Sequence, residues 1–244
     1  MATKYGTRFY DRQSDGSYVS ARQVVPIVAE ILSPRSVVDV GCGTGAWLKA
    51  FQEIGVLDCL GIDGDYVARS RLRIAAESFV AMDLKNPAHL DRTFDLAMSL
   101  ECAEHLEPAA AEGFVRFLTS LAPVVLFSAA APGQGGRHHV NEQWPSYWVR
   151  LFSRFGFVAI DILRPRIWSI PDIQPWYCQN SLLYVAADKL PHFPALLAHS
   201  AAADGRMIDV VHPRFQGGEH RLPTRRLLQL LWNRAKRRMK RRRQ

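Results

Sequence analysis

A segment rich in chemically versatile side chains, GGRHHVNEQWPSYW, runs from Gly135 to Trp148. His138 and His139 are candidate general bases, because an imidazole titrates near neutral pH and can take the proton of a hydroxyl group. The same segment offers hydrogen bonds and flat apolar faces, of the kind that bind sugar rings or other planar molecules, from Asn141, Trp144 and Tyr147. These residue types predict the wall of a binding site with a histidine placed to move a proton.

A second group of potential ligands lies in SLECAEHLEP, which follows a predicted strand. Glu101, Glu104 and His105 are spaced at i, i+3 and i+4, and in a helix this spacing places all three on one face. Two carboxylates and an imidazole can ligate a divalent cation such as Mg²⁺, and His139 could supply a further ligand. Two interpretations stay open: a metal site, with His105 also a candidate for catalysis, or a rim that only shapes a neighbouring binding site.

The elements that must position these residues are short apolar strands alternating with helices. Strands are predicted at 36–40, 59–63, 78–84, 94–101, 124–130, 156–163 and 181–187. Helices are predicted at 24–32, 47–54, 109–121 and 144–155, after an irregular lead-in at 5–20. This alternation is typical of βαβ units, so we predict an α/β fold with a mostly parallel sheet. Ligands of such sheets bind beyond the carboxyl ends of the strands, which is where both segments lie.

A glycine loop, in VVDVGCGTGAW, directly follows the first predicted strand. Gly41, Gly43 and Gly45 allow tight turns and a close approach of the backbone to a ligand, and the next helix offers its N-terminal amides. Asp63 ends the second predicted strand, 22 residues after Gly41, where an acid can accept hydrogen bonds from ribose hydroxyls. Asp83 ends the third predicted strand, where an acid can accept a hydrogen bond from an adenine amino group.

The combination of VDVGCGTG, GID and MDL resembles class I S-adenosylmethionine-dependent methyltransferases over roughly residues 36–187. The resemblance implies a Rossmann-like, seven-stranded sheet that ends in an antiparallel strand and carries helices on both faces. It also implies S-adenosylmethionine as cofactor, with its methionine part at the glycine loop, its ribose at Asp63 and its adenine at Asp83. The cofactor-binding residues implied in this way are Asp39, Gly41, Gly43, Gly45, Asp63, Asp83 and Glu101.

The segments RHHVNEQWPSYW, RPRIW and WYCQN resemble a group of bacterial methyltransferase-domain proteins associated with the biosynthesis of polysaccharides and other surface glycans. This resemblance implies O-methylation of a hydroxyl group on a sugar, a glycan or a related small molecule. The residues expected to contact that acceptor are Asn141, Trp144, Tyr147, Arg166, Trp176 and Asn180. The identity of the acceptor and the choice between an oxygen and a nitrogen atom stay open.

Other functions compete with this prediction. E-x-x-E-H segments similar to 101–105 occur in small-RNA 2′-O-methyltransferases and quinone-pathway O-methyltransferases, where they can bind metal. A metal-dependent RNA 2′-O-methyltransferase is therefore one alternative, although RNA binding normally requires a basic groove. A non-catalytic protein that binds the cofactor, or tethers through a basic tail, is another. An NAD-dependent oxidoreductase matches the glycine pattern but suits Asp83 and the loop at 135–148 poorly.

The formal net charge of +8 belongs to the end of the chain. Ten of the 31 Lys and Arg residues lie at 225–243 without any Asp or Glu, and the rest of the chain carries 21 basic and 23 acidic residues. Apolar residues recur every fourth position from Leu227 to Met239, so a helix here would be amphipathic. Such helices are typical of contact with anionic membranes, while a disordered solubilising tail and a nucleic-acid contact are the alternatives.

We therefore divide the chain into an N-terminal lead-in and helix (1–35), a methyltransferase domain (36–187), an irregular extension (188–223) and a basic amphipathic tail (224–244). Four scattered cysteines without a C-x-x-C pair fit a reducing compartment. The sequence contains no recognisable secretory signal and no apolar stretch long enough to span a bilayer. We expect a bacterial cytoplasmic protein that contacts the inner face of the membrane through its tail.

Overall fold

The computed structural model of the chain describes residues 7–200 and 208–216. The chain divides into a main unit that ends at His212 and a second unit that begins at Pro213. Of the second unit, only the short helix α8 (Pro213–Gln216) is described. The tail at 224–244 lies outside the described residues, so its membrane role stays a prediction. Within the described ranges, no helix is both long and apolar enough to cross a membrane.

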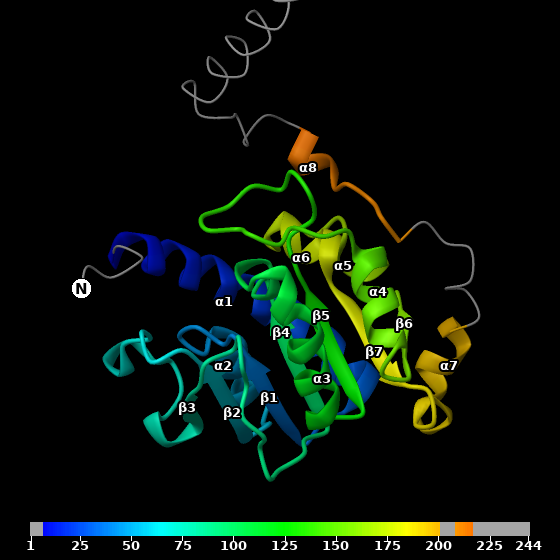
Figure 1. The fold of residues 1–244 in the computed structure, drawn as a ribbon, viewed down its shortest axis with the longest axis horizontal. Helices are drawn as coiled ribbons and strands as arrows, with labels where there is room; N and C mark the ends of the chain where they lie inside the picture. The colour runs from blue at the N-terminus through cyan, green and yellow to red at the C-terminus, as the bar shows by residue number, and fades with distance from the viewer. Residues whose placement is uncertain (1–6, 201–207, 217–244) are drawn as a thin grey trace, which may run out of the picture. The chain divides into compact units, whose positions relative to one another are not determined.

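One sheet forms the centre of the main unit (Figure 1). Its seven strands are β1 (Ser36–Val40), β2 (Asp58–Asp63), β3 (Phe79–Ala81), β4 (Leu96–Leu100), β5 (Val124–Ser128), β6 (Phe157–Ile160) and β7 (Leu182–Ala186). They are arranged in the order β3-β2-β1-β4-β5-β7-β6. The strands from β1 to β5 pair in parallel, whereas β7 is antiparallel to both β5 and β6. This confirms the predicted fold class, including the antiparallel last strand.

The strand order reverses direction at β1. The chain moves outward from β1 through β2 to β3, and then returns to place β4 and β5 on the other side of β1. Val38 of β1 is in register with Leu60 of β2 and with Ala97 of β4. Ligands of open α/β sheets bind at such a reversal, because the loops that leave the two neighbouring strands diverge there. The glycine loop after β1 and the segment 101–105 after β4 are both placed at this reversal.

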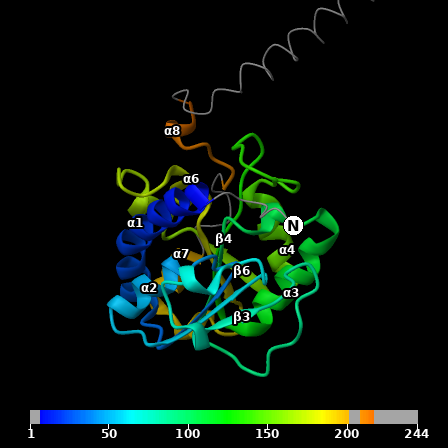
Figure 2. The ribbon, with the colours of Figure 1, turned by 90° about the vertical axis from the view of Figure 1, so that its left-hand side faces the viewer.

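Helices cover both faces of the sheet (Figure 2). On one face lie α1 (Thr7–Leu32) and α2 (Ala46–Glu53), and on the other lie α3 (Ala111–Leu121) and α4 (Pro145–Ser153). Each face buries its own apolar cluster: Val28 and Phe51 belong to the first, and Phe114 and Trp148 to the second. Burial of these side chains in two layers accounts for the stability of a three-layer fold of this size.

The N-terminal helix is longer than predicted. α1 begins at Thr7 and ends at Leu32, so the prediction of an irregular lead-in at 5–20 is wrong over its described part. The hydroxyl of Ser20 accepts a hydrogen bond of 3.0 Å from the backbone N–H of Gln174, a residue far away in the sequence. Contacts of this kind stabilise a helix whose polar sequence does not by itself favour one, since most helical stability in proteins comes from tertiary packing.

The chain after β7 is also more regular than predicted. Described residues of the predicted irregular extension form a 3₁₀ turn (Leu190–His192) and α7 (Pro194–Ser200), and bury Leu190 and Leu196. Between β6 and β7 lie the short helices α5 (Arg164–Ile167) and α6 (Pro175–Asn180). The remaining 3₁₀ turns are Arg69–Arg71, Ala76–Ser78, Ala103–His105 and Pro108–Ala110.

Candidate active site

The glycine loop after β1 packs closely against residues at the ends of β2 and β4. Gly41 has a φ of 86°, and a Cβ atom on it would lie only 2.4 Å from the Sγ atom of Cys102, which follows β4. Gly45, with a φ of 78°, begins α2. The backbone N–H groups of Gly41 and Cys42 both donate to the carbonyl of Ile62, near the end of β2. A side chain at Gly41 or Gly45 would therefore clash with its neighbours, and the lack of side chains at the glycines leaves the backbone open to a ligand.

Asp63, at the end of β2, is bound tightly to this loop. Its Oδ2 atom accepts a hydrogen bond of 2.7 Å from the N–H of Gly43, and its Oδ1 atom accepts bonds from the N–H of Gly64 and the hydroxyl of Tyr66, at 2.6 and 2.5 Å. Burial raises the pKa of Asp63, and the three hydrogen bonds oppose that rise. The contact from Tyr66 was not predicted; its only sequence signal is a phenol three residues beyond the acid.

Asp39, inside β1, is the second buried acid near the loop. It is almost inaccessible to solvent. Burial, and then the charge of Asp63, raise the pKa of Asp39 to about 8. The folded chain therefore favours the protonated carboxyl far more than the unfolded chain does, and the two acids do not ionise together easily.

Replacing Asp39 with asparagine is expected to reduce the loss of stability at alkaline pH. Because the folded-state pKa is raised, this carboxyl stabilises the cofactor-free fold below its ordinary pKa, and that stability is lost as the pH rises through about 8. Thermal unfolding between about pH 5 and pH 9 should show a smaller fall in Tm for Asp39→Asn than for the wild type. The exposed Asp91 provides the control, Asp91→Asn. The same fall in all three proteins would contradict the role of Asp39.

Asp83, the acid predicted to contact adenine, lies two residues beyond β3 and is exposed. Its Oδ1 atom accepts a hydrogen bond of 3.0 Å from the N–H of Lys85. The N–H of Met82 donates to the carbonyl of Asp63 at 2.8 Å, which ties this turn to the end of β2. The acids at 39, 63 and 83 thus follow the carboxyl edge of the sheet together with the glycine loop, while their contacts with the cofactor stay predictions.

Glu101 joins a buried polar network at the end of β4. Its Oε2 atom accepts a hydrogen bond of 2.7 Å from the Nε2 of Gln134, and its Oε1 atom accepts one of 3.1 Å from the Nδ2 of Asn180. Asn180 also donates to the Oε1 of Gln134 at 2.8 Å. Burial raises the pKa of Glu101, and the two amides oppose that rise. Asn180, which was predicted to contact the acceptor, is therefore engaged inside the protein.

The segment from Glu101 to His105 is not an α-helix, so the predicted sharing of one helical face is wrong. The N–H of Glu101 donates to the carbonyl of Ser128 at 3.0 Å and so continues the pairing of β4 with β5. The chain then turns through a φ of 53° at Glu101, and only the 3₁₀ turn Ala103–His105 follows. Strand pairing at Glu101 and helix formation at the same residue exclude each other.

Glu104, His105 and His139 nevertheless converge. Each residue offers one atom that could ligate a metal ion, and these three atoms all lie within 4.8 Å of one another. The Nε2 of His139 is 4.0 Å from the Oε1 of Glu104, and the two imidazole rings meet edge to face with centroids 4.9 Å apart. Glu104 is 1% exposed, and its Oε2 has no hydrogen-bond partner among the described residues. A buried carboxylate oxygen of this kind requires a proton or a cation nearby.

Burial, and then the charge of Glu101, raise the pKa of Glu104 well above its ordinary value. The two imidazoles beside it are each engaged through Nδ1. The Nδ1 of His139 lies 2.9 Å from the Oε1 of Glu142, and the Nδ1 of His105 lies 3.4 Å from the carbonyl of His138. A histidine that binds a metal ion through one ring nitrogen commonly donates a hydrogen bond from the other nitrogen to a carboxylate or a backbone carbonyl. His138, predicted as an alternative base, thus contributes its backbone carbonyl to the cluster.

The loop after β5 also holds Asn141 against the cluster. The N–H of Asn141 donates to the backbone carbonyl of Glu104 at 3.1 Å, and its side-chain Oδ1 accepts a hydrogen bond from Gln143. Its Nδ2 is buried and has no partner within the described ranges. A buried amide with unused N–H groups can donate to an oxygen atom of a bound molecule. The contact of Asn141 with the methyl acceptor stays a prediction.

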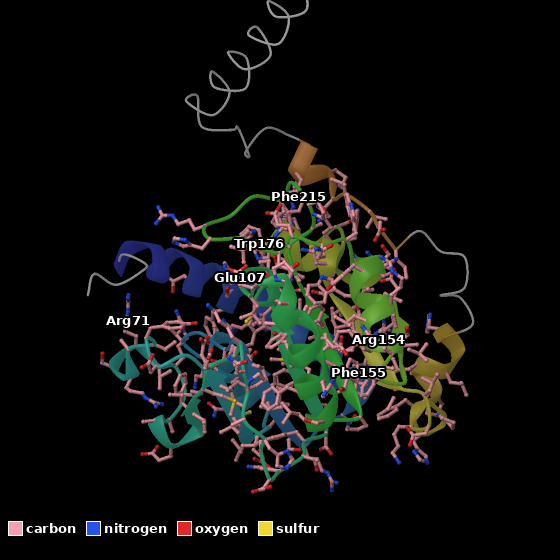
Figure 3. All side chains as sticks on the ribbon, viewed as in Figure 1. Arg71, Glu107, Arg154, Phe155, Trp176 and Phe215 are labelled. Atoms are coloured by element: carbon pink, nitrogen blue, oxygen red, sulfur yellow. The ribbon has the colours of Figure 1, made fainter. Side chains whose placement is uncertain are left out.

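The other predicted acceptor residues are more dispersed. Trp144 precedes α4 and is partly exposed. Tyr147 is half-buried, and its ring meets the ring of Trp148 edge to face. Trp176 is half-buried on α6, in the upper part of the view in Figure 3. Arg166 forms an ion pair of 3.3 Å with Glu30 of α1, so its guanidinium has a partner outside the cluster.

A family model described as "Methyltransferase domain" matches residues 10–160 of the chain. Among solved structures, a putative O-methyltransferase from Nostoc punctiforme is 16% identical with a TM-score of 0.55, over 72% of this chain and 58% of that one. The plantazolicin methyltransferase BpumL, solved in complex with SAH, is 16% identical with a TM-score of 0.51, over 73% of this chain and 86% of that one. At this identity the two structures share the fold.

A curated relative by sequence is the norajmaline N-methyltransferase of Rauvolfia serpentina. It is 28% identical over 109 residues, which are 40% of this chain and 37% of that protein. The chain thus spans little more than a third of the length of this relative and somewhat more than half of the Nostoc protein.

Proposed function

Since the chain belongs to the methyltransferase-domain family, we propose that it transfers the methyl group of S-adenosylmethionine to a hydroxyl group of a sugar, a glycan or a related small molecule. The observation that carries this proposal is the convergence of Glu104, His105 and His139 beside the glycine loop. The loop touches this segment directly, because Gly41 leaves no room for a Cβ atom next to Cys102. This position supports the proposal, because open α/β sheets bind their ligands beyond the carboxyl ends of the strands.

In this proposal, one set of residues binds the cofactor and another set binds and activates the acceptor. S-adenosylmethionine, when bound, supplies an activated methyl group. The glycine loop and Asp63 hold the cofactor, and the buried amide of Asn141 orients the acceptor. The Nε2 of His139 takes the proton of the acceptor hydroxyl, which makes its oxygen a better nucleophile. Correct alignment of the acceptor with the methyl group provides the rest of the acceleration.

The same cluster also fits a divalent cation. Glu104 would provide a carboxylate oxygen. Its buried Oε2, which has no hydrogen-bond partner among the described residues, supports this interpretation. His105 and His139 would provide imidazole nitrogens, which favour a transition metal such as Mn²⁺ over Mg²⁺. Glu101, which was predicted as a further ligand, is engaged with Gln134 and Asn180. A bound cation would lower the pKa of the acceptor hydroxyl and reduce the need for a separate base.

The test of the proposed function is transfer of a labelled methyl group to defined acceptor pools. The full chain is incubated with methyl-labelled S-adenosylmethionine and with soluble sugars, lipid-linked glycans, small amines or short RNAs. We expect the label in a methyl ether of the sugar or glycan pool. Label confined to RNA would instead support the 2′-O-methyltransferase alternative. Binding of S-adenosylmethionine without transfer to any pool would support a non-catalytic, cofactor-binding protein.

We further propose that the basic tail brings the enzyme to the inner face of the membrane, where lipid-linked glycans are assembled. Full-length protein should sediment with anionic liposomes at low salt, because each basic residue near the surface contributes about 1 kcal/mol. High salt should release it by screening these charges. A protein that ends at Pro223 should stay in the supernatant. If the full-length protein also stays there at low salt, the membrane contact is refuted.

A further inference from the structure

We propose that Glu142 is the positioning residue of the cluster, which fixes both the tautomer of His139 and the loop that carries it. The proposal rests on the proposed function, in which His139 takes a proton or binds a cation. Its basis is the contact of 2.9 Å between the Oε1 of Glu142 and the Nδ1 of His139. Because a carboxylate only accepts hydrogen bonds, the hydrogen of a neutral His139 ring must sit on Nδ1. The lone pair is then on Nε2, the nitrogen that lies 4.0 Å from Glu104.

The same carboxylate closes the loop on itself. Its Oε2 atom accepts a hydrogen bond of 2.9 Å from the N–H of Gly133, and its Oε1 atom accepts one of 3.1 Å from the N–H of Gly135. Both glycines have positive φ angles, 86° and 74°, which most other residues avoid. Three N–H groups, two from the backbone and one from His139, thus converge on Glu142. A single side chain couples the shape of the loop to the state of the imidazole.

The loop leaves little freedom for the His139 ring. A Cβ atom on Gly136 would lie 2.1 Å from the Nε2 of His139, so the ring packs directly on the backbone of Gly136. His105 has a weaker equivalent, since its Nδ1 lies 3.4 Å from the carbonyl of His138. The two histidines are therefore held through Nδ1 by different acceptors. An ionised acceptor makes the stronger hydrogen bond and raises the basicity of the opposite nitrogen, so Glu142 exerts the greater control.

The direct test is the tautomer of His139, which can be read from ¹⁵N chemical shifts of its ring at a pH where the ring is neutral. His139→Gln identifies the signals by their loss. We expect hydrogen on Nδ1 and a bare Nε2 in the wild type, and a mixture of tautomers in Glu142→Ala. Glu107→Ala is the matched control, because it removes an exposed carboxylate that lies close to the cluster in sequence. An unchanged His139 tautomer in Glu142→Ala would refute the proposal.

Binding of Mn²⁺, measured by calorimetry, provides a second readout that does not depend on activity. We expect Glu142→Ala to weaken Mn²⁺ binding by about 10- to 100-fold and Glu107→Ala to leave it unchanged. If the wild type does not bind Mn²⁺, the metal part of the proposed function fails, while the tautomer measurement still decides the role of Glu142. Should Glu142→Ala not fold, Glu142→Gln carries both tests. The single amide oxygen of Gln cannot accept from both sides, so an intermediate effect is expected; wild-type behaviour in both tests would refute the proposal.

Discussion

Replacing His139 with alanine is expected to lower the rate of methyl transfer by roughly 10²-fold or more, while the affinity for S-adenosylmethionine stays unchanged. The reason is the position of its ring, which contacts Glu142 through Nδ1 and faces Glu104 through Nε2. The glycine loop and Asp63, which we expect to hold the cofactor, make their contacts with each other and not with this ring. The measurement combines initial rates on the acceptor that the labelling experiment identifies with calorimetric titration of the cofactor.

The neighbouring histidine provides the control for this prediction. His138 contributes a backbone carbonyl to the cluster and has a φ of 61°, a conformation that asparagine tolerates well. His138→Asn should therefore keep most of the activity. Equal losses in both variants would show that the loop as a whole, and not the His139 ring, is required. Full activity of His139→Ala would exclude it both as a base and as an essential metal ligand.

A chelator separates the two chemical roles of the cluster. If His139 acts as a simple base, the wild-type rate should not change when divalent cations are removed. If the cluster holds a cation, the chelator should abolish the activity and added Mn²⁺ or Mg²⁺ should restore it. Glu104→Gln sharpens this distinction, because an amide cannot replace a carboxylate as an anionic ligand. The variant should lose rescue by the cation while cofactor binding persists.

Replacing Asp63 with alanine is expected to weaken the binding of S-adenosylmethionine by about 1–3 kcal/mol, or roughly 5- to 150-fold in Kd. Two losses combine in this variant. The acceptor expected to bind the ribose hydroxyls disappears, and the N–H of Gly43 loses the oxygen that holds it at 2.7 Å. The glycine loop would therefore be less well ordered when the cofactor arrives. Calorimetric titration measures the effect directly.

Tyr66 provides the matched comparison for Asp63. Its hydroxyl donates to the Oδ1 of Asp63, whereas 64% of the residue is exposed to solvent. Tyr66→Phe removes this hydroxyl, which would compete with a ribose for the same oxygen, and leaves the carboxylate in place. The variant should bind the cofactor at least as well as the wild type. Unchanged affinity in Asp63→Ala, with a normal circular dichroism spectrum, would refute the ribose assignment.

The sequence alone determined the fold and the placement of the predicted cofactor site. Short β-branched runs such as SVVDV are local signals of buried strands, and their alternation with helices leads to a parallel sheet. Parallel strands direct their carboxyl ends to one edge, so residues that follow different strands must lie near one another. For this reason Asp63, Asp83 and the glycine loop could be predicted as one site from their positions in the chain.

Only the tertiary structure decided which polar side chains meet at the candidate active site. Spacing suggested that Glu101 would act with Glu104 and His105, but pairing of Glu101 with β5 prevents a helix there and Gln134 and Asn180 engage its carboxylate. No local pattern encodes such a choice, because the partners lie in β5, in the loop that follows it and in α6. The helix α1 also extends through the predicted lead-in, where contacts with distant residues stabilise it. One of them is the hydrogen bond from the N–H of Gln174 to the hydroxyl of Ser20.

The role of Glu142 illustrates the physical reason most clearly. In the sequence it is one polar residue among several in HVNEQW, without a spacing that distinguishes it. In the fold, its carboxylate gathers the N–H groups of Gly133 and Gly135 together with the ring of His139. Hydrophobic periodicity is a property of neighbouring residues and can be read along the chain. Hydrogen bonds between polar groups of a loop depend on angles and distances of a few ångströms, and these exist only once the loops have folded against the sheet.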